Sequence, residues 1–286
     1  MGEIIDGKKI AKSIRDEVAQ AIKKISANGG RIPKLVVVLV GDDPASQTYV
    51  RNKERACNEV GIISEVRRVP GTISEKELLD IVKQLNNDKS VDGMLVQIPL
   101  PKQVRENAVT NTIAPEKDVD GLHPTNMGRL LKGENPEMVP CTPRGIIEMI
   151  KSTGVQIKGK EAVVVGRSNI VGKPVALLLL QEHATVTICH SRTADLGDVT
   201  RRADILIAAV GSPGIINGEM VKQGAVVIDV GTNRVGEKLV GDVDYDSAKE
   251  RAAFISPVPG GVGPMTIAML MKNTLRAYES RTAKNP

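Results

Sequence analysis

The chain has 286 residues, of which 41% are hydrophobic and 26% charged, and its formal net charge is +5. This is the composition of a globular protein, its length predicts two domains, and no stretch approaches the roughly 20 apolar residues that span a bilayer. The absence of Trp, the single Phe and the dispersal of Lys and Arg among acidic residues argue against nucleic-acid binding. The basic excess fits small anionic ligands better.

The first residues and the cysteines indicate no export and no metal site. Residues 1–12 include Glu3 and Asp6 and lack a hydrophobic signal core, so we expect a cytoplasmic protein without membrane association. The cysteines and histidines are scattered and lack the spacing of metal ligands or of a disulfide framework, so we expect buried, reduced thiols and no metal. These residues are Cys57, Cys141, Cys189, His123, His183 and His190.

The first part of the chain has the pattern of an α/β domain. Residues 8–26 carry apolar side chains at helical spacing, and KLVVVLV at 34–40 is the continuous run of a strand buried on both faces. Asp43 and Pro44 are suited to cap and open a helix that continues to about residue 60. The other predicted elements of this part are strands at 63–69 and 91–98 and a helix at 75–86.

A second α/β series follows a crossing segment rich in turn-forming residues, which begins after Pro99. Its strands alternate with helices, as in a doubly wound sheet. The last predicted helix is apolar, begins after the peptide PGGVGP and could pack on the first domain. The predicted elements are a helix at 145–154, strands at 162–165, 185–189, 204–210 and 225–230, a helix from Lys173 and the last helix at 264–278.

The peptide VVVGRSNIVGKP, at 163–174, lies where a Rossmann fold binds a pyrophosphate, between a strand and a helix N-terminus. It is neither Gly-x-Gly-x-x-Gly nor a P-loop, because Pro174 stands where a P-loop has the Ser or Thr that binds magnesium. Gly166 and Gly172 are therefore consistent with a dinucleotide site and equally with a tight strand-to-helix connection.

The end of the next strand, which reads CHSRT, favours a dinucleotide carrying a 2′-phosphate. NAD enzymes place a carboxylate at this point to accept a hydrogen bond from the ribose. Ser191 and Arg192 instead supply a donor and a cation, and Arg167 is a second cation nearby. NADP is thus preferred over NAD, with a solvated surface arginine as the alternative for Arg192.

Tyr49 and Lys53 lie at i and i+4, so both project from one face of the predicted helix. A semi-buried lysine can serve as an acid or base, although most lysines on such a face are simply solvated. Gln97, at the end of a buried strand, could hold the lysine amine, and Asp120, in a loop, could bind a heterocycle with adjacent N–H donors. Taken singly, Gln97 and Asp120 are also consistent with a strand-end amide and a turn residue.

Together these peptides resemble the bifunctional methylenetetrahydrofolate dehydrogenase/methenyltetrahydrofolate cyclohydrolase family of the bacterial FolD type. A shikimate-type or amino-acid-type NADP dehydrogenase would explain the second domain equally well but not Tyr49, Gln97 and Asp120 together. The matching peptides, in family order over essentially the whole chain, are ASQTYVRNK, VDGMLVQIPLP, KDVDGLHPTNMGRL, PCTPRG, VVVGRSNIVGKP, CHSRT, IDVGTN and PVPGGVGPMT.

The resemblance implies two reactions and a two-domain α/β fold. NADP would oxidise 5,10-methylenetetrahydrofolate, and water would open the methenyl product to 10-formyltetrahydrofolate. Residues 1–120 with 265–286 would form a three-layer catalytic domain and 121–264 a Rossmann-type, doubly wound NADP domain. An active-site cleft would lie between them, and the protein would be a homodimer through the second domain.

The resemblance also implies roles for individual residues. Lys53 would be the general acid/base, Gln97 would hold and tune it, Tyr49 would stack on the folate ring, and Asp120 would bind the pterin. The folate-lining residues would be Pro259, Gly260 and Gly261. The NADP-binding residues would be Gly166, Arg167, Ser168, Gly172, Ser191, Arg192, Thr232, Thr142 and Cys141, the last being equally consistent with a structural role.

Overall fold

The structure is a computed structural model that describes residues 1–134, 136 and 138–283. The chain divides into two compact units, which we name by their sheets. The six-stranded unit comprises Met1–Lys12 and Thr142–Thr266, and the three-stranded unit comprises Ser13–Cys141 and the chain from Ile267 onward. In the described residues, no helix has the length and apolar character needed to cross a membrane.

The observed units and the domains expected from the sequence differ in three segments. Residues 1–12 and 265–266 belong to the six-stranded unit, and 121–141 belong to the three-stranded unit. The long helices α1 (Gly7–Ala27) and α10 (Val262–Ala283) each contribute residues to both units. Helix α10 therefore begins in the six-stranded unit and ends in the three-stranded unit.

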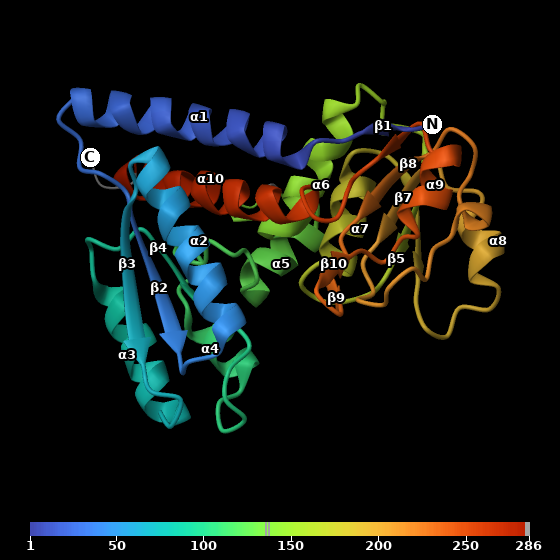
Figure 1. The fold of residues 1–286 in the computed structure, drawn as a ribbon. Helices are drawn as coiled ribbons and strands as arrows, with labels where there is room; N and C mark the ends of the chain where they lie inside the picture. Colours follow the sequence, from blue (N-terminus) through green and yellow to red (C-terminus); the bar gives the residue numbers. More distant parts are fainter. Residues whose placement is uncertain (135, 137, 284–286) are drawn as a thin grey trace. The chain divides into compact units, whose positions relative to one another are not determined.

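The three-stranded unit is built on a parallel sheet in which β2 (Lys34–Val40) lies between β3 (Ile63–Val69) and β4 (Gly93–Val96). Six of the seven β2 residues are buried, as expected for a strand covered on both faces. The helices α3 (Glu75–Asn87) and α4 (Glu106–Thr112) pack on one face, and α2 (Pro44–Val60) contacts β2 and β3 (Figure 1). This is the predicted three-layer arrangement.

The six-stranded unit contains a parallel sheet with the order β1-β11-β8-β7-β5-β6. The strand order reverses at β5, which lies between β6 and β7, so the sheet is doubly wound. The strands are β1 (Glu3–Ile4), β5 (Glu161–Val165), β6 (Thr185–Cys189), β7 (Ile205–Ala208), β8 (Val226–Asp229) and β11 (Phe254–Ile255).

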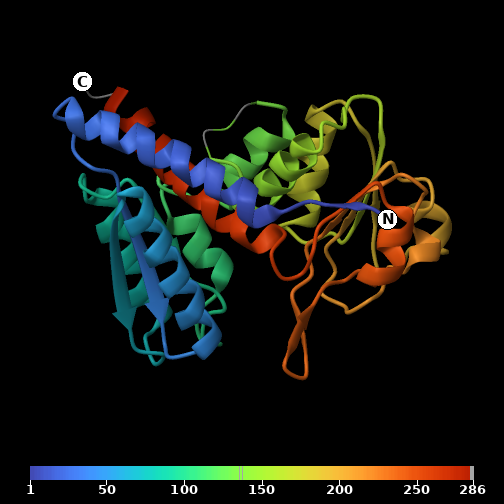
Figure 2. The same ribbon diagram turned by 45° about the horizontal axis from the view of Figure 1, so that its top comes forward.

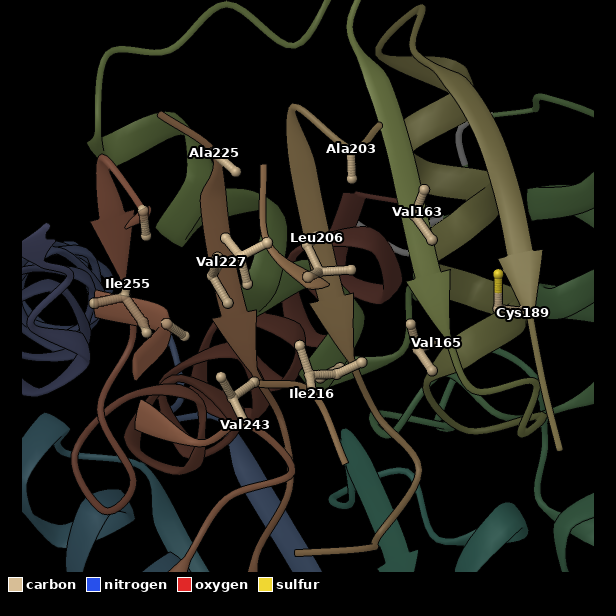
Figure 3. Close-up of a cluster of buried hydrophobic side chains, with 14 residues drawn as sticks. Val163, Val165, Cys189, Ala203, Leu206, Ile216, Ala225, Val227, Val243 and Ile255 are labelled. Atoms are coloured by element: carbon tan, nitrogen blue, oxygen red, sulfur yellow. The ribbon is translucent and has the colours of Figure 1, made fainter. Parts of the chain in front are cut away.

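Alternate residues of these strands form one continuous core. Figure 3 shows Val163, Leu206, Val227 and Ile255, from four adjacent strands, pointing to the same side of the sheet. Each of the four side chains is fully buried. Because the residues between them, such as Val164, are buried as well, the sheet is covered on both faces.

The remaining elements connect these layers. Figure 2 shows the antiparallel hairpin β9–β10 extending from the six-stranded unit in orange. The elements are α5 (Pro124–Leu131), α6 (Cys141–Ser152), α7 (Gly172–Gln181), α8 (Leu196–Thr200), the 3₁₀ turn Gly218–Met220, β9 (Asn233–Val235), β10 (Lys238–Val240) and α9 (Tyr245–Arg251).

Two strands of the larger sheet were not predicted. Strands β1 and β11 have two residues each, which is too short for any periodicity to appear in the sequence. They pair with each other in parallel, Glu3 with Phe254 and Ile4 with Ile255. Pairing across almost the entire chain explains why residues 1–12 belong to this unit.

Candidate active site

Lys53 lies on α2, whose start is determined by its own sequence. The Asp43 carboxylate accepts a hydrogen bond from the Ser46 backbone N–H at 2.7 Å, and Pro44 occupies the first turn. Lys53 is half-buried, whereas Tyr49, one turn earlier, is 53% exposed. Both side chains can therefore meet a ligand. The helix packs through Ser46, Val50, Ala56, Cys57 and Val60.

Gln97 supplies a hydrogen-bond partner for Lys53. The Lys53 Nζ donates to the Gln97 Oε1 at 3.0 Å, and the Gln97 side chain is buried. The Gln97 Nε2 donates to the Ile98 carbonyl at 2.7 Å, and its backbone N–H donates to the Val38 carbonyl at 2.9 Å. Since Ile98 uses the amide nitrogen, the amide oxygen is directed at Lys53. Two residues selected separately from the sequence thus lie in direct contact.

The loop that carries Asp120 is anchored by the two charged residues Lys117 and Asp118, which the sequence analysis did not select. The buried Asp118 carboxylate accepts hydrogen bonds from the His123 backbone N–H at 2.7 Å and the Asn126 Nδ2 at 3.0 Å. Burial raises the pKa of Asp118. The buried Lys117 Nζ donates at 2.7–2.8 Å to three carbonyls at the end of α3, those of Leu85, Asn86 and Asp88.

Asn273, on α10, connects this loop to Cys141. The buried Asn273 Nδ2 donates to the Val119 carbonyl at 2.8 Å and approaches the Cys141 Sγ at 3.5 Å. Burial raises the pKa of Cys141 well above its usual value; the Asp120 carboxylate raises it further, while the Lys53 ammonium lowers it. Cys141 is therefore a neutral thiol within the electrostatic influence of both Lys53 and Asp120.

In the six-stranded unit, the turn between β5 and α7 requires glycine at two positions. Gly166 has a φ of +125°, and a Cβ there would lie 2.1 Å from the Ala209 carbonyl oxygen. A Cβ on Gly172 would lie 2.2 Å from the Gly166 carbonyl oxygen. The Ser168 Oγ accepts hydrogen bonds from the Val171 and Gly172 N–H groups at 3.1 and 3.3 Å. The close backbone approach explains the glycines whether or not a phosphate binds.

Ser191 and Arg192 follow β6 in a short turn that leaves both side chains exposed. The His190 backbone N–H donates to the Thr193 Oγ1 at 2.9 Å, and the Arg192 N–H donates to the His190 Nδ1 at 3.1 Å. Arg167, after β5, is also exposed. The structure therefore presents the predicted cations at the carboxyl ends of two adjacent strands.

A cavity of about 390 Å³ lies within the six-stranded unit. Its lining includes Thr142, Thr232 and Pro259–Gly261, which were predicted as ligand-binding residues from three separate peptides. The residues selected after β5 and β6 do not line it, whereas Lys8 and Asp229, which were not selected, do. The peptide IDVGTN contained Asp229; no local signal pointed to Lys8. The described residues contain no cluster of His, Cys, Asp and Glu that could hold a metal ion.

Both parts of the chain match models of one protein family. Residues 5–120 match the tetrahydrofolate dehydrogenase/cyclohydrolase catalytic domain. Residues 140–282 match the NAD(P)-binding domain of tetrahydrofolate dehydrogenase/cyclohydrolase.

Individual relatives extend this similarity over the full chain. The chain is 61% identical to the bifunctional protein FolD of Halothermothrix orenii, over 97% of this chain and 98% of the relative. It is also similar to the solved FolD of Campylobacter jejuni, with a TM-score of 0.96, 44% identity and coverage of 98% and 100%. A third relative is the Trypanosoma brucei FolD complexed with NADP and an inhibitor, with a TM-score of 0.95, 41% identity and 98% coverage of both chains.

Proposed function

Because the chain belongs to the tetrahydrofolate dehydrogenase/cyclohydrolase family, we propose that the residues described above carry both of that family's activities. The protein oxidises 5,10-methylenetetrahydrofolate to 5,10-methenyltetrahydrofolate with NADP, and it hydrolyses the methenyl compound to 10-formyltetrahydrofolate. The hydrogen bond between Lys53 and Gln97 is the observation that carries the assignment of the chemical centre.

The six-stranded unit supports the assignment of the NADP site. Its β5 turn and β7 loop lie where the strand order reverses, which is where open α/β sheets bind their ligands. The exposed Ser191 and Arg192 supply a donor and a cation for a 2′-phosphate. When bound, NADP accepts the hydride from the methylene carbon. The chain itself needs only to hold the reacting groups in line and to exclude water.

Lys53 acts in the hydrolytic reaction. The Gln97 oxygen keeps the Lys53 Nζ in one orientation. The amine takes a proton from water as the water oxygen bonds to the methenyl carbon. The bond from that carbon to N5 then breaks as N5 receives the proton from Lys53 and the new hydroxyl group loses its proton to water, which leaves the formyl group on N10.

Asp120 and Tyr49 position the folate. Asp120 lies on an anchored loop and is only partly buried, so its carboxylate can accept hydrogen bonds from the pterin N–H groups. The exposed Tyr49 ring lies one turn from Lys53 and offers a face for stacking. In the six-stranded unit, Pro259, Gly260 and Gly261 line the cavity, and the family resemblance assigns them a folate-lining role.

Replacing Lys53 by Met tests this assignment. We expect methenyltetrahydrofolate hydrolysis to fall roughly 10²- to 10⁴-fold, because the proton acceptor is lost. NADP binding and the circular dichroism spectrum should be unchanged. Lys76→Met is the matched control, since Lys76 is exposed on α3 of the same unit. Hydrolysis by Lys53→Met at the wild-type rate would refute the role.

We further propose that the protein is a cytoplasmic homodimer that associates through the six-stranded unit. Three reduced, buried cysteines fit a reducing compartment. Among the described residues, exposed large hydrophobic side chains are more numerous on this unit and include Leu180, Ile188 and Leu239. Light scattering should give twice the chain mass of 30.6 kDa, and a monomer at micromolar concentration would contradict the proposal.

A further inference from the structure

Two buried carboxylates of the six-stranded unit lie outside the residues assigned above as catalytic or ligand-binding. Asp229 is the last residue of β8 and is 3% exposed, and Asp242 follows β10 and is 0% exposed. Buried carboxylates are unfavourable unless their oxygens accept hydrogen bonds or pair with cations. Their partners here are almost all backbone N–H groups, so each carboxylate determines the course of the surrounding chain.

Asp242 accepts hydrogen bonds from the loop that follows β7. Its Oδ2 accepts hydrogen bonds from the backbone N–H groups of Val210 at 2.6 Å and Gly211 at 3.0 Å. Its Oδ1 accepts from the Ser212 N–H at 2.9 Å and from the Asn233 Nδ2 at 2.9 Å. Three consecutive N–H groups therefore converge on one carboxylate, which fixes the backbone of residues 210–212.

Asp229 fixes Asp242 in turn. The Asp229 Oδ1 accepts hydrogen bonds from the N–H groups of Gly231 at 3.0 Å and Asp242 at 2.9 Å, and its Oδ2 accepts from the Val243 N–H at 3.0 Å. A Cβ on Gly241 would lie 1.7 Å from the Asp229 Oδ2. The carboxylate thus packs directly against bare backbone, and the two aspartates form one hydrogen-bonded unit.

The loop held by Asp242 borders the place where the dinucleotide is expected. It follows β7, the neighbour of β5 at which the strand order reverses. The Gly166 turn approaches the residue just before this loop, because a Cβ on Gly166 would meet the Ala209 carbonyl oxygen. Gly231, which donates to Asp229, lines the cavity together with Thr232.

We propose that Asp242, held by Asp229, is a positioning residue for NADP: it shapes the 210–212 loop, which directly follows the residue that the Gly166 turn approaches. This inference rests on the proposed function. Only the dehydrogenase reaction consumes NADP, whereas hydrolysis of added methenyltetrahydrofolate needs water alone. The two activities of one protein therefore separate a cofactor-positioning role from a general role in folding.

The experiment is the replacement Asp242→Asn. Asparagine has an NH₂ group in place of one carboxylate oxygen, and that group cannot accept hydrogen bonds from the two N–H groups that face it. The loop therefore loses hydrogen bonds and its fixed shape. We expect the NADP Kd from calorimetric titration, and the KM for NADP, to rise about tenfold or more, in line with one or two lost charge-assisted hydrogen bonds. Hydrolysis of methenyltetrahydrofolate without cofactor should stay within about twofold of wild type, because no NADP-binding group takes part in it.

Two further variants complete the test. Asp246→Asn removes the same charge from an exposed position four residues away and should leave NADP binding unchanged. Asn233→Ala removes one of the four donors and should weaken NADP about threefold, a milder change that keeps the test usable if Asp242→Asn does not fold. Unchanged NADP binding in both the Asp242 and Asn233 variants, or an equal fall of both activities, would overturn the proposal. A wild-type protein that neither binds NADP nor hydrolyses methenyltetrahydrofolate would instead refute the proposed function.

Discussion

At the scale of single residues, the proposed chemistry depends on how a few polar side chains are oriented. Gln97 offers Lys53 an oxygen because its own nitrogen is engaged by Ile98. A glutamine free to rotate would present either group. Arg192 differs from the buried Gln97, because its side chain extends into solvent from an exposed turn. There it is accessible to an anionic ligand.

Replacing Arg192 by Ala should weaken NADP about 10- to 100-fold, because a charge-assisted contact to the 2′-phosphate is lost. NAD lacks that phosphate and should be affected less than about twofold. Competition titrations with both dinucleotides measure the two effects. Arg202→Ala, which removes an exposed arginine from the same unit, should leave the NADP-to-NAD ratio unaltered. Equal weakening of both cofactors by Arg192→Ala would rule out a contact with the 2′-phosphate.

At the scale of elements, helix ends in this protein are completed by distant side chains. The ammonium of Lys117 satisfies the carbonyls of Leu85, Asn86 and Asp88 at the end of α3. A cation suits this end of a helix, where unpaired carbonyls carry partial negative charge. The same contact fixes the loop that leads to Asp120. The lysine that caps α3 therefore also positions Asp120, the residue proposed to bind the pterin.

We expect Lys117→Met to lower the free energy of unfolding by about 1–3 kcal/mol at pH 7, because three carbonyls at the end of α3 lose their donor. Urea unfolding followed by circular dichroism measures this change. The exposed Lys76→Met, on α3 itself, should change stability by less than about 0.5 kcal/mol. A Lys117→Met protein as stable as wild type would show that water replaces the lysine.

The stability of wild type and that of Lys117→Met should depend differently on pH. Burial lowers the pKa of Lys117 from 10.5 to about 8, so both folded and unfolded chains carry the charge at pH 7. Between pH 8 and pH 10.5, Lys117 has released its proton in the folded protein but still holds it in the unfolded chain. Stability therefore rises with pH in this window through Lys117. The unfolding free energy of wild type minus that of Lys117→Met should increase from pH 8 to pH 10.5.

At the scale of the whole molecule, each unit contains its own sheet, core and cysteines. Cys57 and Cys141 belong to the three-stranded unit and Cys189 to the six-stranded unit, and all three are buried. Burial raises the pKa of Cys57 to about 12 and also raises that of Cys189. Neither thiol should react in the folded protein, so modification reports the opening of the unit that contains it.

NADP should slow the modification of Cys189 by a thiol reagent. Cys189 directly precedes the turn of Ser191 and Arg192, so any opening that exposes it also disrupts the proposed NADP site. At about 100 times its Kd, NADP should reduce the open population roughly 100-fold. A variant that retains only Cys189 makes the measurement direct, and free nicotinamide is the control ligand. Modification at the same rate with and without NADP would contradict the assignment of the site.

The sequence by itself determined the elements with strong local patterns and the family. The continuous apolar runs of β2, β5 and β7 appear as strands because a strand buried on both faces needs no polar alternation. Lys53 and Gln97 could be selected because each belongs to a recognisable peptide. The sequence suggested that Gln97 could hold the lysine amine, but their hydrogen bond joins positions 44 residues apart, so only the folded chain shows it.

Only the tertiary structure decided the features whose partners are remote in the chain. The strands β1 and β11 have two residues each, and they exist because they pair with each other. Lys117 resembles a surface lysine until its three carbonyl partners are known, and Asp242 resembles a turn residue until the N–H groups of the 210–212 loop surround it. A buried charge is stable only where folding brings hydrogen-bond donors or acceptors to it. Those groups are distant in the sequence, so local periodicity does not reveal them.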